Sequence, residues 1–155
     1  MKRGILIFLL LLFVFMPLVA GCNSSPNSSA QGETEIKIKT MTLRGKSMEP
    51  TIKDGTKIKI NINAYVSAVP QRGDVIAFKA DNNSVIVKRV VALPGEEVEI
   101  KDKSIFIDGI ELEEDYLSEL DSTEAPADNS VWQVPESSVF VLSDNRKNGS
   151  DSRNF

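Results

Sequence analysis

The chain has 155 residues, of which 41% are hydrophobic and 26% charged, a balance typical of a soluble domain with a hydrophobic core. It contains no histidine and one cysteine, which excludes a Ser-His-Asp triad, a Cys-His dyad, a histidine-ligated zinc site and an internal disulfide. The formal net charge of −4 argues against binding to nucleic acid. General-base chemistry near neutral pH would therefore need a lysine, a carboxylate, a tyrosine or the terminal amine with a shifted pKa.

Residues 1–21 have the pattern of an export signal. A positive start is followed by an uncharged apolar run from Ile5 to Ala20, which is short for a membrane-spanning helix of about 20 residues. The segment from Leu18 to Cys22 resembles the bacterial lipobox, in which the cysteine thiol receives a diacylglycerol and the chain is cut before it. The alternative is an uncleaved anchor helix with an incidental cysteine. Both interpretations attach the chain to membrane lipid on the extracytoplasmic face of the cell membrane.

Residues 22–34 are rich in Ser, Asn, Gly and Pro and have almost no apolar content. Such a segment cannot bury enough surface to order itself, and we expect a flexible linker. The domain that follows, residues 35–155, is more acidic than basic, so a polybasic lipid-binding patch is not expected. The N-terminal anchor would then carry the membrane attachment.

From residue 35 onward the pattern predicts short strands. Isoleucines alternate with polar residues over 57–62, which indicates a strand with one buried face. Runs rich in β-branched residues at 75–78 and 84–91 are apolar on both faces, as in buried strands. The remaining features are a hairpin over 105–112 with Asp108-Gly109 at its turn, a polar surface excursion over 113–130, and a strand over 139–142. The sequence predicts an all-β, mainly antiparallel domain.

Two residues stand out as candidates for chemistry. Lys88 lies in the middle of the most apolar predicted strand, where burial disfavours the ammonium and lowers the lysine pKa. The alternative is a lysine at a sheet edge that extends its amine to water. Ser47 follows a predicted strand, in a loop whose backbone path is restricted by Gly45 and Pro50; the alternative there is an ordinary turn serine.

Taken together, these segments resemble bacterial type I signal peptidases. The resemblance rests on four boxes that occur in the family's order and cover most of the exported domain. They are Ser47–Thr51 (SMxPT), Arg72–Phe78 (RGDIVxF), Val87–Glu96 (KRVxGLPGD) and Ser143–Arg153 (GDNRxxSxDSR). Gly45 stands where some members have a serine two residues before the nucleophile, which matches the variant common in Gram-positive bacteria.

The resemblance implies a partly open β-barrel fold and a membrane-bound serine endopeptidase that removes signal peptides from exported preproteins. Ser47 would be the nucleophile and its backbone N–H the oxyanion donor, while Lys88 would be the general base. Asp144, Asp151 and Arg153 would brace the active site. The implied substrates carry small residues at the first and third positions before the cut, and no cofactor or metal is implied.

The chain departs from the family pattern in the last box and at its end. Gly149 stands where the family has a serine that hydrogen-bonds the lysine amine, and Ser143 replaces the usual glycine. Ser150 could supply the missing hydroxyl if the loop shifts, and otherwise we expect Gly149→Ser to raise the cleavage rate. The chain ends at Phe155, where the family continues, so we expect the family's last strand to be lacking. These departures favour the alternative function, a weak or inactive signal-peptidase-like lipoprotein that binds export substrates or a partner.

Overall fold

The computed structural model describes residues 36–80, 83–117 and 131–155. The expected signal over 1–21, the linker over 22–34 with Cys22, and most of the predicted excursion lie outside these residues. Within the described ranges the regular structure consists of strands and contains no helix. Accordingly, no helix that is long and apolar enough to cross a membrane is found in this part of the chain.

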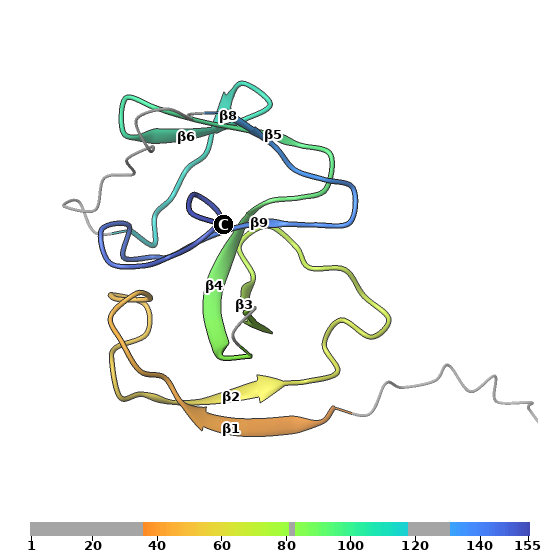
Figure 1. The fold of residues 1–155 in the computed structure, drawn as a ribbon, viewed down its shortest axis with the longest axis vertical. Helices are drawn as coiled ribbons and strands as arrows, with labels where there is room; N and C mark the ends of the chain where they lie inside the picture. Colours follow the sequence, from red (N-terminus) through yellow and green to blue (C-terminus); the bar gives the residue numbers. More distant parts are fainter. Residues whose placement is uncertain (1–35, 81–82, 118–130) are drawn as a thin grey trace, which may run out of the picture. The chain divides into compact units, whose positions relative to one another are not determined.

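The strands form three antiparallel sheets (Figure 1). β1 (Ile38–Thr42) pairs with β2 (Lys57–Asn61). The second sheet has the order β3-β4-β9, and the third has the order β7-β6-β5-β8. This arrangement confirms the all-β, mainly antiparallel fold class. The remaining bounds are β3 Val75–Lys79, β4 Val85–Ala92, β5 Glu97–Lys101, β6 Ser104–Ile107, β7 Ile110–Glu111, β8 Val131–Gln133 and β9 Phe140–Leu142.

The local sequence explains several of these elements. In β2 the isoleucines are half-buried and the alternating polar residues are exposed, as the period of two predicts. The predicted hairpin is formed by β6 and β7, and its turn residues Asp108 and Gly109 have φ angles of 50° and 78°. Two consecutive positive φ angles define the turn type that best matches the twist of paired strands, and Asp-Gly is a preferred sequence for it.

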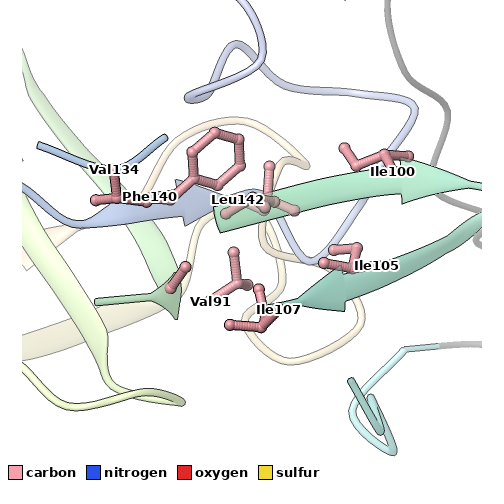
Figure 2. Close-up of a cluster of buried hydrophobic side chains, with 9 residues drawn as sticks. Val91, Ile100, Ile105, Ile107, Val134, Phe140 and Leu142 are labelled. Carbon is pink, nitrogen blue, oxygen red and sulfur yellow. The ribbon is translucent and has the colours of Figure 1, made fainter. Parts of the chain in front are cut away.

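The main core lies where β4 and β9 face β5 and β6. Figure 2 shows Val91, Leu142, Ile105 and Ile107 pointing toward one another, with Phe140 and Val134 beside them. β4 contributes the final part of its length to this cluster, through the fully buried residues Val91 and Ala92. The strand that carries Lys88 is therefore anchored in the part of the domain with the largest buried cluster.

The prediction that the strand at 75–78 is buried on both faces is wrong. Val75 is 39% exposed, and Val85 at the start of β4 is 38% exposed. A smaller cluster of Leu43, Met48 and Val87 packs at this end of the domain, with Ile58 and Ala77 partly buried against it. Beside it lies a groove of about 720 Å³, lined mainly by apolar residues of β2, β3 and the segment between them.

Candidate active site

Ser47 lies in the loop that follows β1 and is half-buried. Met48 is completely buried in the smaller hydrophobic cluster and so anchors the loop that carries Ser47. The Ile52 N–H donates to the Met48 carbonyl at 2.7 Å, and Gly45 has a φ of 92°, which a glycine adopts without strain. The Asn145 N–H donates to the Ser47 carbonyl at 2.9 Å, which ties this loop to the segment after β9.

Lys88 occupies β4, the central strand of its sheet, and is 4% exposed. Its partner in β3 is Ile76 and its neighbour Val90 is fully buried, so the lysine at a sheet edge that reaches water is not what the structure has. The Nζ atom of Lys88 lies 3.1 Å from the Oγ atom of Ser47. The fold thus brings together the two residues that sequence analysis singled out.

Burial lowers the pKa of the Lys88 amine from its ordinary value, and this effect exceeds the opposite influence of the Asp151 and Asp144 carboxylates. A lower pKa raises the fraction of neutral amine at a given pH, which is the form that can accept a proton. Ser47 also presents a backbone donor: within the described residues, no acceptor takes its N–H. A serine hydroxyl, a lysine amine with a lowered pKa and a backbone N–H donor therefore lie together.

Asp144 is the second residue after β9 and is completely buried. Its two carboxylate oxygens accept hydrogen bonds from Nε and Nη2 of Arg89, at 2.8 and 2.7 Å. Arg89 also donates to the Gly73 carbonyl at 2.9 Å. No motif in the sequence marked Arg89 as a site residue, although its place beside Lys88 in a buried strand required a carboxylate partner on the opposite face.

Asp151 and Arg153 form a second buried ion pair, with 2.8 Å between Nε and Oδ1. Asp151 also accepts the Ser143 N–H at 3.0 Å, and Arg153 donates to the Arg146 carbonyl at 2.8 Å. Burial alone would raise the pKa of the Asp151 carboxyl, but its hydrogen bonds with Arg153 and Ser143 outweigh it, so the pKa is lowered. These contacts join the two ends of the loop that follows β9.

The segment after β7 contributes residues that sequence analysis missed. The Glu114 side chain is 8% exposed and pairs with the fully buried side chain of Arg146. The Tyr116 ring lies under the Arg89 guanidinium, 4.0 Å from its carbon, and its hydroxyl donates to Glu114. The prediction of a polar surface excursion is therefore wrong for residues 114 and 116. Glu114 lies within a polar stretch, and nothing in the neighbouring sequence indicated that it would have a buried partner.

The last box differs from expectation at Gly149 and Ser150. Ser150 is exposed, and among the described residues no hydrogen bond joins it to Lys88. A Cβ atom at Gly149 would lie 2.1 Å from the Ser143 Oγ and 3.2 Å from the Ser47 Cβ. The Ser143 side chain fills the space that a side chain at position 149 needs, so Gly149→Ser would require Ser143 to move, and its effect on the cleavage rate stays a prediction.

The comparisons with known proteins agree on one family. Residues 4–155 match the family described as "Signal peptidase, peptidase S26". The chain is 34% identical over 128 residues to signal peptidase IB of Staphylococcus aureus, covering 74% of this chain and 67% of that protein. It is 37% identical over 120 residues to signal peptidase I of Bacillus licheniformis, covering 72% and 64%.

Among solved structures, a signal peptidase I from Enterococcus faecalis is 39% identical, with a TM-score of 0.47. The match covers 57% of this chain and 87% of that structure. Within the residues that the structure describes here, no group of three or more Cys, Asp or Glu side chains is placed to hold a metal ion.

Proposed function

This chain belongs to the signal peptidase family, peptidase S26, a family of serine hydrolases, and we propose that Ser47 and Lys88 form the catalytic dyad with which it removes signal peptides. The single observation that carries the proposal is the distance of 3.1 Å between Ser47 Oγ and the Nζ atom of Lys88, a residue that is 4% exposed. This distance lies within the range needed for proton transfer.

The proposed reaction uses the Lys88 amine twice. In its neutral form the amine takes the Ser47 proton as Oγ attacks the scissile carbonyl, and the free Ser47 N–H stabilises the negative charge on the carbonyl oxygen. The Lys88 ammonium then gives its proton to the leaving amine, which breaks the peptide bond and leaves an acyl group on Ser47. Lys88 next removes a proton from water, the hydroxide attacks the ester, and the proton returns to Ser47.

The proposed substrates are exported preproteins with small residues at the first and third positions before the cut. An extended peptide exposes alternate side chains on one face, so these two residues would point the same way. Support comes from the apolar groove, whose lining includes Ile52 and Val87, which are close in sequence to Ser47 and Lys88, and Ala77, which pairs with Val87. A preprotein segment lying along this groove would present its scissile carbonyl at the dyad.

For the N-terminus we propose a signal over 1–21, a linker over 22–34 and a catalytic domain over 35–155. Cys22 would become the acylated N-terminus and hold the domain on the extracytoplasmic face of the membrane. Mass spectrometry of the membrane fraction tests this: Cys22→Ser should retain residues 1–21. A wild-type protein that keeps Met1 and carries no lipid would instead indicate an uncleaved anchor helix.

Cleavage of a precursor with an Ala-x-Ala site tests the dyad. We expect Ser47→Ala and Lys88→Met to abolish cleavage while circular dichroism and the melting temperature show a folded domain. Activity of the parent enzyme should fall at low pH, with an apparent pKa below the free-lysine value of 10.5. Cleavage near the parent rate in either variant would contradict the mechanism. A parent that binds precursor without cutting it would favour the alternative, a substrate-binding lipoprotein.

A further inference from the structure

The segment 143–146, directly after β9, contacts the loop of the proposed nucleophile through its main chain. The Asn145 N–H donates to the Ser47 carbonyl at 2.9 Å. The preceding residue, Asp144, accepts two hydrogen bonds from the Arg89 side chain of β4. The conformation of this short segment therefore affects both the loop that carries the serine and the strand that carries the base.

The side chain of Arg146 holds the segment in its conformation. Its Nε donates to the Ser143 carbonyl at 2.8 Å, so the last residue of the segment is tied back to the first. The Arg146 carbonyl in turn accepts a hydrogen bond from Arg153 at 2.8 Å. The Arg146 side chain is fully buried, and a guanidinium at such a place needs a carboxylate that balances its charge.

Glu114, from the segment after β7, supplies that carboxylate. Nη1 and Nη2 of Arg146 donate to its Oε2 and Oε1 at 3.1 and 2.5 Å. Two parallel hydrogen bonds fix the plane of a guanidinium as well as its position. Because Nε lies in the same plane, Glu114 also sets the direction in which Nε–H points to the Ser143 carbonyl. Glu114 lies outside the four boxes on which the family resemblance rests.

We propose that Glu114 is a positioning residue for Ser47. Its carboxylate orients Arg146, and the guanidinium keeps the segment 143–146 in the conformation that presents the Asn145 N–H to the Ser47 carbonyl. This inference rests on the proposed catalytic dyad. Among the described residues, the Asn145 contact is the backbone hydrogen bond that Ser47 forms. Without it the serine hydroxyl would shift relative to its base, and small displacements of reacting groups lower a rate strongly.

The first test is kinetic. Glu114→Gln keeps the size of the side chain and removes its charge. It should lower kcat about tenfold and leave KM unchanged, since other elements line the apolar groove. Glu114→Asp keeps the charge and should recover part of the kcat. The control Glu96→Gln removes the carboxylate of the Arg72–Glu96 ion pair, at 2.6 Å. It should lower the melting temperature and leave the kcat of the folded enzyme unchanged.

The second test follows the contact itself, by amide hydrogen exchange. The Asn145 N–H is protected by its hydrogen bond with Ser47 and should exchange at least about tenfold faster in Glu114→Gln. The Val134 N–H, which donates to the Glu96 carbonyl at 2.9 Å in the main core, is the control and should not change. Unchanged exchange at Asn145, or an unchanged kcat in folded Glu114→Gln, would overturn the inference.

If Glu114→Gln does not fold, Arg146→Lys decides. A lysine keeps a cation beside Glu114, but its single ammonium lacks the fork of donors that holds the carboxylate and the Ser143 carbonyl together. The kcat should fall and the exchange at Asn145 should rise; no change in either would overturn the inference. The proposed function is judged separately. A parent enzyme that cleaves no precursor would reject it, whereas the exchange at Asn145 would still test the role of Glu114.

Discussion

Two faces of one strand can be compared at consecutive residues, Lys88 and Arg89 of β4. Arg89 faces the buried carboxylate of Asp144 and the Tyr116 ring, and its hydrogen bonds with Asp144 raise its pKa. Lys88 faces Ser47, and no carboxylate of the described residues is in hydrogen-bond contact with it, so burial lowers its pKa. Two neighbouring basic residues thus have opposite pKa shifts: Arg89 is held as a permanent charge, and Lys88 is shifted toward the neutral amine that the proposed dyad needs.

The largest expected effect on activity comes from replacing the lysine at position 88 with arginine. Lys88→Arg keeps a positive charge but replaces the amine with a group that does not release its proton near neutral pH. We expect a loss of about 10²- to 10⁴-fold or more in kcat, the range that a general base supplies. The reciprocal control Arg89→Lys preserves a charge opposite Asp144 and should lose far less activity. Comparable losses in both variants would contradict separate roles for the two faces.

The next largest effect is expected on stability, when the Asp144 carboxylate is removed. Asp144→Asn leaves Arg89 without a charged partner, and breaking one side of a buried ion pair costs about 3–5 kcal/mol in the free energy of unfolding. Urea denaturation measures this. The matched control is Glu99→Gln, because the Lys101–Glu99 pair has side chains that are 49% and 32% exposed and should contribute less than about 1 kcal/mol.

Asp144→Asn should also affect Lys88 on the opposite face of β4, because the Asp144 carboxylate raises the pKa of Lys88. Without that charge the Lys88 pKa should fall further, and the acid limb of the pH profile of kcat/KM should move to lower pH. An acid limb that moves to higher pH in Asp144→Asn would contradict this coupling between the two faces.

A smaller effect on stability is expected when the buried Lys88 amine is removed. Because the Lys88 pKa is lowered in the folded state, the unfolded chain binds more protons between that pKa and 10.5. The free energy of unfolding should therefore increase with pH across this window. Lys88→Met should remove the increase and be more stable than the parent below the window, whereas the exposed control Lys39→Met should leave the increase in place. A less stable Lys88→Met would show that burial of this amine costs the fold nothing.

The comparison also shows what the sequence could predict. Residue type and period placed Lys88 in a buried strand and the hairpin at Asp108-Gly109, because both depend on neighbours in the chain. The partners of Arg89 and Arg146 could not be found in this way, since Glu114 and Tyr116 lie in a polar segment and become buried through contacts distant in sequence. The steric conflict of Gly149→Ser with Ser143 could not be predicted for a similar reason, because it depends on the space that Ser143 occupies and not on the conformation of Gly149.

The smallest expected effect concerns the ring that covers Arg89. Tyr116→Phe keeps the ring 4.0 Å from the guanidinium and removes the hydroxyl contact with Glu114, whereas Tyr116→Leu removes the ring as well. The difference between the two variants in the free energy of unfolding should be about 0.5–1 kcal/mol, the contribution of a cation–π contact. Urea denaturation in an Arg89→Met background supplies the control, because the difference should shrink there to what packing alone gives. A difference that persists unchanged in that background would mean that Tyr116 stabilises the domain by filling space. The charge on this face of β4 would then be held by Asp144 without help from the ring.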